Sequence, residues 1–137
     1  MLPPKVLMVD DEKDLEFLAR QKFRKALAAG HFQLIFAQNG QDALDIIQND
    51  PSIEVVISDI NMPELDGLTL LKRTQEIRPE IRTILVSAYG DIDTLRQAMS
   101  YHAFDFVTKP VDFADLEASI LRGLQSCAGA PNTPNAS

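Results

Sequence analysis

Short runs of apolar residues recur along the chain and define five candidate strands. These runs are Val6–Val9, Leu34–Phe36, Val55–Ile57, Ile84–Val86 and Phe104–Val107. Four of them are continuous, whereas a strand with one solvated face would show polar residues at alternate positions. Continuous runs rich in β-branched side chains are typical of parallel strands covered on both faces. The pattern therefore predicts a buried parallel sheet.

Segments with helical spacing of apolar residues separate these runs. The five helical stripes are Leu15, Leu18, Phe23 and Leu27; Ala43, Leu44 and Ile47; Leu68, Leu70 and Leu71; Leu95, Ala98 and Met99; and Leu116, Ile120 and Leu124. Asn39 and Asp112 stand where helix N-caps are expected, and the third stripe stops before Pro79. Strand and helix thus alternate five times, which predicts an α/β domain with helices on both faces of a parallel sheet.

The alternation ends near residue 125. A chain of 137 residues is the size of one domain, and 45% hydrophobic residues with 24% charged residues are ordinary for a globular protein. The segment Ala128–Ser137 contains Gly129, Pro131 and Pro134 but no charge and no large apolar residue. We therefore expect a domain over residues 1–125 and a flexible tail or truncated linker over 126–137.

Charge and cysteine content exclude several classes of protein. Twenty acidic residues against thirteen basic ones give a net charge of −7, so we expect no direct binding of nucleic acid. The single cysteine, Cys127, cannot form an internal disulfide. No segment approaches the ~20 apolar residues of a membrane span, and the first apolar run is too short for a signal peptide. These features predict a cytoplasmic protein without membrane contact.

Four of the five predicted strands end on a charged or hydroxyl-bearing residue: Asp10 and Asp11, Asp59, Ser87, and Lys109. Ligands of open α/β sheets bind at this carboxyl edge. If the first and third strands are neighbours, their carboxylates converge, and each pair ~4 Å apart repels by about 4 kcal/mol at an effective dielectric of ~20. Lys109 or a hard divalent cation must offset that charge, and oxygen ligands without His or Cys favour Mg²⁺ over zinc.

These strand ends resemble the receiver domain of two-component response regulators. The matching motifs are Asp10-Asp11, Ser58-Asp59-Ile60-Asn61-Met62-Pro63, Ser87-Ala88 and Lys109-Pro110, within a resemblance that covers residues 4–125. Each motif is weak alone, but four in order at this spacing are specific. The resemblance implies a doubly wound (βα)5 sandwich whose five-stranded parallel sheet has the flavodoxin-like order 2-1-3-4-5.

The resemblance also implies a chemistry for these residues. Asp59 would accept a phosphoryl group from a histidine kinase or a histidine phosphotransfer protein. Asp11 and Asp59 would ligate Mg²⁺ directly, together with the backbone carbonyl of Asn61, and Asp10 would hold the ion through water, with Mn²⁺ as an alternative ion. Lys109 would contact the phosphoryl group. Charge neutralisation of this kind is most of what phosphoryl transfer requires.

Further positions would set the response to phosphorylation. Ser87 would hydrogen-bond a phosphoryl oxygen and Phe106 would be the switch aromatic; the family more often has threonine and tyrosine at these two positions. Asn61 and Tyr89 flank the site, and we expect them to tune the lifetime of the phosphoryl group. The resemblance favours a cis peptide bond between Lys109 and Pro110, whereas composition does not decide between the isomers.

Two surfaces are candidates for partners. The first helix carries Arg20, Lys22, Arg24 and Lys25 with no acid between Phe17 and Gly30. The resemblance implies that this helix region docks the kinase or phosphotransfer protein; a merely solvated helix face is the alternative. Residues 91–125, which include the fourth helix, the fifth strand and the fifth helix, would bind an output partner or form a homodimer.

Two other functions stay open. A Mg²⁺-dependent aspartyl phosphohydrolase would carry its labile phosphate on Asp10, but Asp10-Asp11-Glu12 lacks the usual Asp-x-Asp arrangement. A non-phosphorylated interaction module usually lacks one of the acidic or lysine positions, all of which are present here. We therefore expect a switch that catalyses its own phosphorylation and slow hydrolysis and turns over no separate substrate.

Overall fold

The computed structural model of the chain describes residues 2–62, 64–88 and 92–129. Its elements alternate between strand and helix. In chain order they are β1 (Lys5–Val9), α1 (Lys13–Lys22), α2 (Arg24–Ala28), β2 (Gln33–Ala37), α3 (Gly40–Asn49), β3 (Ile53–Asp59), α4 (Gly67–Ile77), β4 (Arg82–Ser87), α5 (Ile92–Ser100), β5 (Asp105–Thr108) and α6 (Phe113–Gly129). None of the helices in this described part is long and apolar enough to cross a membrane.

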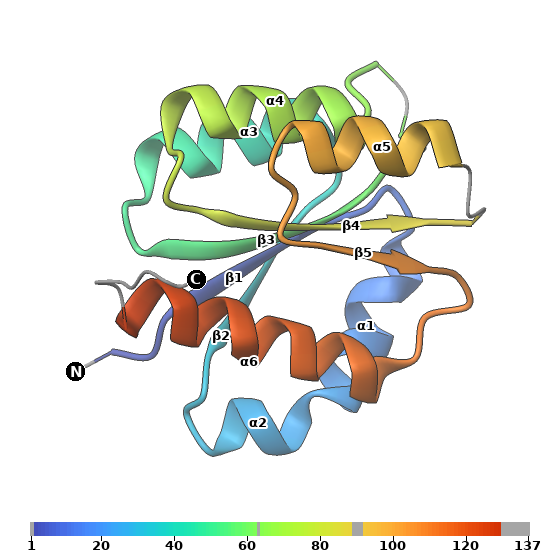
Figure 1. Cartoon of the computed structure of the whole chain (residues 1–137). Coiled ribbons are helices and arrows are strands. Elements are labelled where there is room, and N and C mark those ends of the chain that lie inside the picture. Colours follow the sequence, from blue (N-terminus) through green and yellow to red (C-terminus); the bar gives the residue numbers. More distant parts are fainter. Residues whose placement is uncertain (1, 63, 89–91, 130–137) are drawn as a thin grey trace.

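The five strands form one parallel sheet in the order β2-β1-β3-β4-β5. Helices α3, α4 and α5 cover one face, and α1, α2 and α6 cover the other (Figure 1). The predicted architecture and strand order are therefore confirmed. Because β1 lies between β2 and β3, the residues that follow β1 and β3 meet at one edge.

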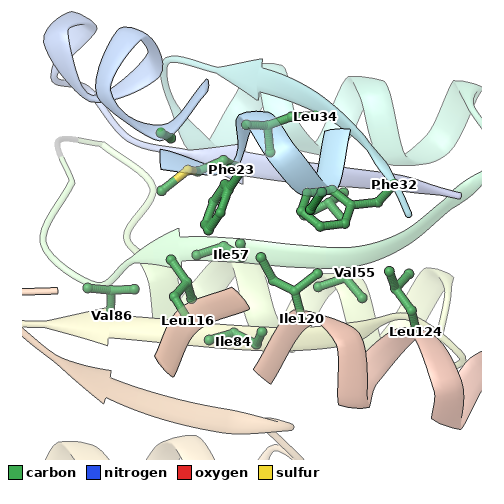
Figure 2. Packing of buried hydrophobic residues seen from close by; sticks show 14 residues of the cluster. Phe23, Phe32, Leu34, Val55, Ile57, Ile84, Val86, Leu116, Ile120 and Leu124 are labelled. Carbon is green, nitrogen blue, oxygen red and sulfur yellow. The ribbon is translucent and has the colours of Figure 1, made fainter. Parts of the chain in front are cut away.

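Side chains of each strand alternate between the two helical layers. Val6 and Met8 belong to the core beneath α1, α2 and α6, and Leu7 and Val9 to the core beneath α3 and α4. Figure 2 shows the first of these cores, where Phe23 at the junction of α1 and α2 meets Phe32 just before β2: the two rings stack edge to face at 5.8 Å. Full burial of each such side chain stabilises the fold by about 1.5–3 kcal/mol.

Two of the predicted helical stripes differ from the structure. The first stripe does not form one helix: α1 ends at Lys22, α2 begins at Arg24, and Phe23 lies between them with ψ near 9°. Ala19 and Ala26 fill the buried side there, while Leu18 is 39% exposed. On α5, Leu95 and Met99 are exposed and Ala98 alone of the predicted stripe is buried. Small residues thus face the sheet where the helices approach it closely.

The predicted caps are present. Asn39 Oδ1 accepts a hydrogen bond from the Asp42 N–H at 2.8 Å, and Asp112 Oδ1 accepts one from the Ala114 N–H at 2.9 Å. Such caps satisfy backbone donors that a helix leaves unpaired at its first turn. At the other end of α6, the helix continues past residue 125 to Gly129, so its last residues belong to the segment expected to be a tail.

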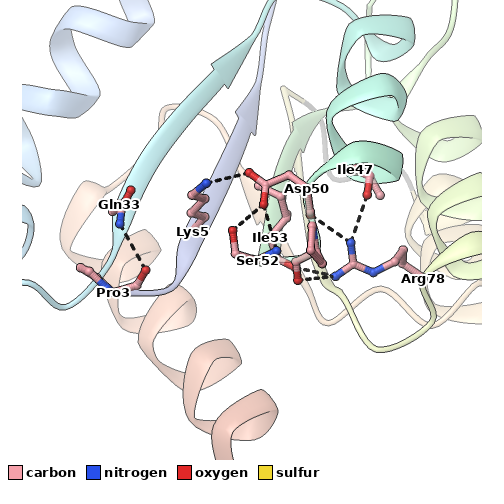
Figure 3. Close-up of polar contacts among 9 residues, drawn as sticks. Pro3, Lys5, Gln33, Ile47, Asp50, Ser52, Ile53 and Arg78 are labelled. Atoms are coloured by element: carbon pink, nitrogen blue, oxygen red, sulfur yellow. Dashed lines mark hydrogen bonds and ion pairs between the residues drawn. The ribbon is translucent and has the colours of Figure 1, made fainter. Parts of the chain in front are cut away.

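A polar network ties together the amino ends of the strands (Figure 3). The guanidinium of Arg78 donates to four backbone carbonyls, those of Ile47, Asp50, Pro51 and Ile53, at 3.0–3.2 Å. The Lys5 ammonium binds the Asp50 carboxylate at 2.8 Å and, with Ser52, lowers the pKa of Asp50 to about 2. This network joins the end of α3, the start of β3 and the loop after α4.

We expect Arg78→Lys to lower the free energy of unfolding by about 1–2 kcal/mol, because lysine keeps the charge but loses the planar fork that reaches four carbonyls. Urea denaturation measures the change. The control is Arg73→Lys on the exposed side of α4. Equal midpoints for the two variants would show that the fork contributes nothing.

His102 offers a second test of local energetics. It follows α5 with φ near 66°, where its N–H donates to the Met99 carbonyl. The left-handed region costs an L-residue about 1–2 kcal/mol, while glycine loses about 0.5–1 kcal/mol of chain entropy. His102→Gly should therefore raise the free energy of unfolding by about 0.5–1 kcal/mol, whereas Ser100→Gly, within the helix, should lower it. Thermal unfolding of both variants measures the two signs.

Candidate functional site

The carboxyl edge of the sheet brings together four of the residues that the sequence singled out. Val9 of β1 pairs with Ser58 of β3, so the next residues, Asp10 and Asp59, are neighbours. Asp10 is 6% exposed and Asp59 7%, which is unusual burial for acidic side chains, and the neutral Ser87 beside them is 5% exposed. Lys109 reaches the same place from the end of β5. The strand order thus creates the site.

Lys109 forms the central ion pair of the site. Its Nζ lies 2.7 Å from Oδ2 of Asp59, whose Oδ1 accepts the Asn61 N–H at 3.1 Å. The Lys109 N–H donates to the Ser87 carbonyl at 2.7 Å, and the Lys109–Pro110 peptide bond is cis. Backbone and side chain of Lys109 therefore connect β5 to both β4 and β3.

The charges at this edge are not balanced. The pKa of Asp10 is raised from 3.8 to about 6, and burial is the largest cause. The negative charges of Asp59 and Glu12 also raise it, whereas the hydrogen bond from the Glu12 N–H and the positive charge of Lys109 lower it. Burial lowers the pKa of Lys109, but its hydrogen bond and charge interactions with Asp59, Asp10 and Glu12 outweigh that effect, so the pKa is raised. The single lysine forms its ion pair with Asp59, so two carboxylates share one positive charge at this edge.

The donor set at this edge suits a hard cation. Asp10 and Asp59 offer carboxylate oxygens, and Asn61 follows with its backbone carbonyl; Mg²⁺ takes one or two carboxylates and keeps several waters. Asp11 is exposed. Within residues 2–62, 64–88 and 92–129, no group of three or more His, Cys, Asp or Glu is placed to hold a metal. Two buried carboxylates with one lysine nevertheless leave a negative charge that a divalent ion would offset.

Gly67 fixes the loop after Asp59. Its N–H donates to the Ile60 carbonyl at 2.9 Å. A Cβ at this position would lie 2.5 Å from the Asp59 carbonyl oxygen and 2.8 Å from Cα of Ile60. The start of α4 can therefore pack against the backbone of the candidate phosphoacceptor only because residue 67 has no side chain.

The expected switch residues lie on the α5 side of the site. Phe106 is half-buried and packs against the core that contains Leu85, Ala98 and Ala103. Beside it, Asp105 accepts hydrogen bonds from Ser119 Oγ at 2.6 Å and from Arg122 at 3.1 Å. Arg122 is therefore paired within the chain. Tyr89, the second residue expected to tune the site, lies outside the described residues.

An apolar cavity of about 300 Å³ opens beside the ion pair. Its walls come from β1, β3, β4, α1 and the loop after β5. The lining residues are Met8, Val9, Asp10, Glu12, Leu15, Leu18, Ile57, Asp59, Val86, Lys109, Pro110, Val111 and Phe113. The sequence did not reveal this cavity, because its walls lie far apart in the chain.

The basic residues of the first helical segment do not act as one face. Arg20 pairs with Glu16 at 3.2 Å, donates to the Leu34 carbonyl at 3.1 Å and lies over the Phe36 ring. Lys22, Arg24 and Lys25 are exposed and line a shallow cavity at the junction of α1 and α2. Arg20 therefore attaches α1 to β2, and the other three bases form the charged surface.

Glu12 is the site residue that the sequence analysis missed. Its N–H donates to Asp10 Oδ1 at 2.9 Å, and its side chain lines the mouth of the cavity. An Asp side chain that accepts an N–H two residues on is a common turn motif, so the spacing of Asp10 and Glu12 was an available signal.

Comparisons with known proteins agree with this geometry. Residues 6–121 match the family model described as response regulator receiver domain. Sporulation initiation phosphotransferase F of Bacillus subtilis is 31% identical over 124 residues, covering 90% of this chain and 96% of that protein. Regulatory protein AtoC of Escherichia coli is 36% identical over 121 residues, covering 88% of this chain but 25% of AtoC, so the chain spans about a quarter of that relative.

Solved structures show the same fold. The crystal structure of a response regulator receiver domain protein from Clostridium thermocellum superposes with a TM-score of 0.84 at 27% identity, covering 93% of this chain and 98% of that one.

The raised pKa of Asp10 predicts how stability depends on pH. The folded state holds a proton on Asp10 up to about pH 6, whereas the unfolded state releases it near 3.8. Stability therefore falls as pH rises through this window, by about 2–3 kcal/mol in all. In EDTA, we expect Asp10→Asn to be more stable than the wild type at pH 7.5 by about that amount, with the difference vanishing near pH 4.

Urea denaturation across pH 4–8 measures this effect. The matched control is Asp11→Asn, which alters the exposed neighbouring carboxylate and should leave the pH profile unchanged. A wild-type profile identical to that of Asp10→Asn would contradict the prediction.

Proposed function

The chain belongs to the response regulator receiver domain family, and from that premise we propose that it is a switch controlled by phosphorylation of Asp59. The observation that carries the proposal is the buried Asp59 carboxylate at the end of the middle strand, held 2.7 Å from the Lys109 ammonium. A buried nucleophile beside a fixed cation is what transfer of an anionic phosphoryl group requires. The domain would comprise residues 1–125 and work in the cytoplasm.

The reaction is a transfer between two proteins. A carboxylate oxygen of Asp59 attacks the phosphorus of a phosphohistidine, and the N–P bond breaks with its electron pair returning to the imidazole. Lys109 stays beside the group and offsets its charge. Bound Mg²⁺, held by Asp10, Asp11, Asp59 and the Asn61 carbonyl, would neutralise the transferring phosphoryl oxygens. The product is an acyl phosphate on Asp59, which water later hydrolyses.

The same proposal assigns the response. The Ser87 hydroxyl moves to a phosphoryl oxygen, and Phe106 turns inward into the space that this movement leaves. A local change of charge then selects between two packings of α5, β5 and α6. That surface, within residues 91–125, would bind an output partner or a second copy. Asn61 and Tyr89 would set the lifetime of the acyl phosphate.

The phosphodonor would approach at α1. Phe17 is 72% exposed there, on the helix that begins three residues after Asp10. A histidine kinase or histidine phosphotransfer protein docked on this helix can place its imidazole over the carboxyl edge. The protein would catalyse its own phosphorylation and dephosphorylation without turning over a separate substrate.

Intact-mass spectrometry with Mg²⁺ and acetyl phosphate or phosphoramidate tests the proposal. We expect one labile phosphate on the wild type and none on Asp59→Asn, because the amide removes the nucleophile. Asp14→Asn, which changes an exposed carboxylate on α1, should be labelled like the wild type. EDTA should abolish labelling.

Three results would contradict this function. A phosphate mapped to Asp10 would support an aspartyl phosphohydrolase. Labelling that survives Asp59→Asn would place the acceptor elsewhere. No label from either donor, together with no spectral change on adding beryllofluoride and Mg²⁺, would support a non-phosphorylated interaction module.

A further inference from the structure

We propose that the apolar cavity beside Asp59 is a binding site for a small hydrophobic amine, with its hydrocarbon part inside the cavity and its ammonium at the mouth. The cavity volume, its walls and the charges at its opening all favour this class of ligand. Binding itself does not depend on phosphorylation.

The inside of the cavity is lined by hydrocarbon. Met8, Ile57 and Val86 form the floor on the sheet, with Ile57 and Val86 visible in Figure 2. Leu15 and Leu18 form one wall on α1, and Pro110 and Val111 of the loop after β5 form the other together with Phe113 at the start of α6. An apolar cavity of about half this volume stays dry and binds benzene. A cavity of about 300 Å³ therefore has room for a substituted ring or a branched chain.

The mouth of the cavity carries the charge that selects the head group. Asp10, Glu12 and Asp59 face it with a single lysine, Lys109, which is already paired with Asp59. Within the described part of the chain, neither Asp10 nor Glu12 forms an ion pair with a basic side chain. Asp10 is only 6% exposed. An ammonium here gains a buried anionic partner, whereas a carboxylate ligand would be repelled.

The position of the head group links this site to the proposed function. An ammonium at Asp10 occupies the place where Mg²⁺ would be held, so amine and Mg²⁺ would exclude one another. This competition with Mg²⁺ is the one part of the inference that rests on the proposed function. A hydrophobic amine would then act as an inhibitor of phosphorylation.

Binding is tested with phenethylamine and the metal-free, EDTA-treated protein. Titration followed by ¹H–¹⁵N correlation spectra should shift the amides of Val9, Leu15 and Val111 in a saturable manner. Two control ligands separate the contributions: 2-phenylethanol, an isostere, keeps the ring without the charge, and ethylamine, a truncated analogue, keeps the charge without the ring. We expect 2-phenylethanol to bind up to about fivefold more weakly than phenethylamine, the size of one ion pair near the surface, and ethylamine to bind at least about tenfold more weakly, the size of one buried ring.

Two variants with matched controls locate the ligand. Leu18→Asn makes the α1 wall polar and should weaken phenethylamine binding at least fivefold, whereas Phe17→Asn, on the same helix but outside the cavity, should not. Glu12→Gln should reduce the preference for phenethylamine over 2-phenylethanol, whereas Asp14→Asn should preserve it. All four side chains are exposed, so the fold should survive each change, and far-UV circular dichroism checks this.

The outcomes are decisive for the inference. Equal binding of phenethylamine and 2-phenylethanol would overturn the role of the carboxylates. The proposed site would be overturned if phenethylamine caused no saturable amide shifts. It would also be overturned if Phe17→Asn weakened phenethylamine binding as much as Leu18→Asn does. If binding is confirmed but 10-fold excess Mg²⁺ over the amine leaves its affinity unchanged, the cavity site stands and the metal site at Asp10 fails. The phosphorylation test above remains independent of each result.

Discussion

The contact between Lys109 and Asp59 is the interaction on which the carboxyl edge of this molecule depends. The strand order places two nearly buried carboxylates, Asp10 and Asp59, side by side, and burial of like charges is unfavourable. Lys109 compensates Asp59 and, through its N–H on Ser87, also fixes the end of β5 against β4. Removing its side chain would leave an uncompensated buried charge on Asp59, next to the backbone bond that ends the pairing of β4 and β5. Electrostatics and sheet geometry are therefore coupled at this point.

The sequence predicted the parts of the structure that follow from local pattern. Continuous apolar runs became the sheet, and the polar residues Asn39 and Asp112 became caps, because strand burial and capping depend on neighbours along the chain. It was wrong where packing distance decides. Ala19 faces the core instead of Leu18, and of the predicted stripe on α5 only Ala98 is buried, since a helix close to a sheet has room only for a small side chain.

The site shows the same division. Convergence of Asp10, Asp59 and Lys109 followed from motif order, because all strands of a parallel sheet end at one edge. Which carboxylates are buried did not follow: Asp11 is exposed, and the turn that aims Asp10 inward depends on the Glu12 N–H. The cavity was not predictable from the sequence either, because it forms between α1 and the loop after β5. Leu15 and Val111, which line its two sides, are nearly a hundred residues apart in the chain.

The two edges of the sheet differ in how well their polar groups are satisfied. At the amino edge, Arg78 saturates four carbonyls and Lys5 pairs with Asp50, which stabilises the charged form of that carboxyl. At the carboxyl edge, burial raises the pKa of Asp10 to about 6, and an apolar cavity lies beside it. Both features lower stability. Natural proteins keep such local conflicts mainly where they bind or react, which supports the function proposed for the carboxyl edge.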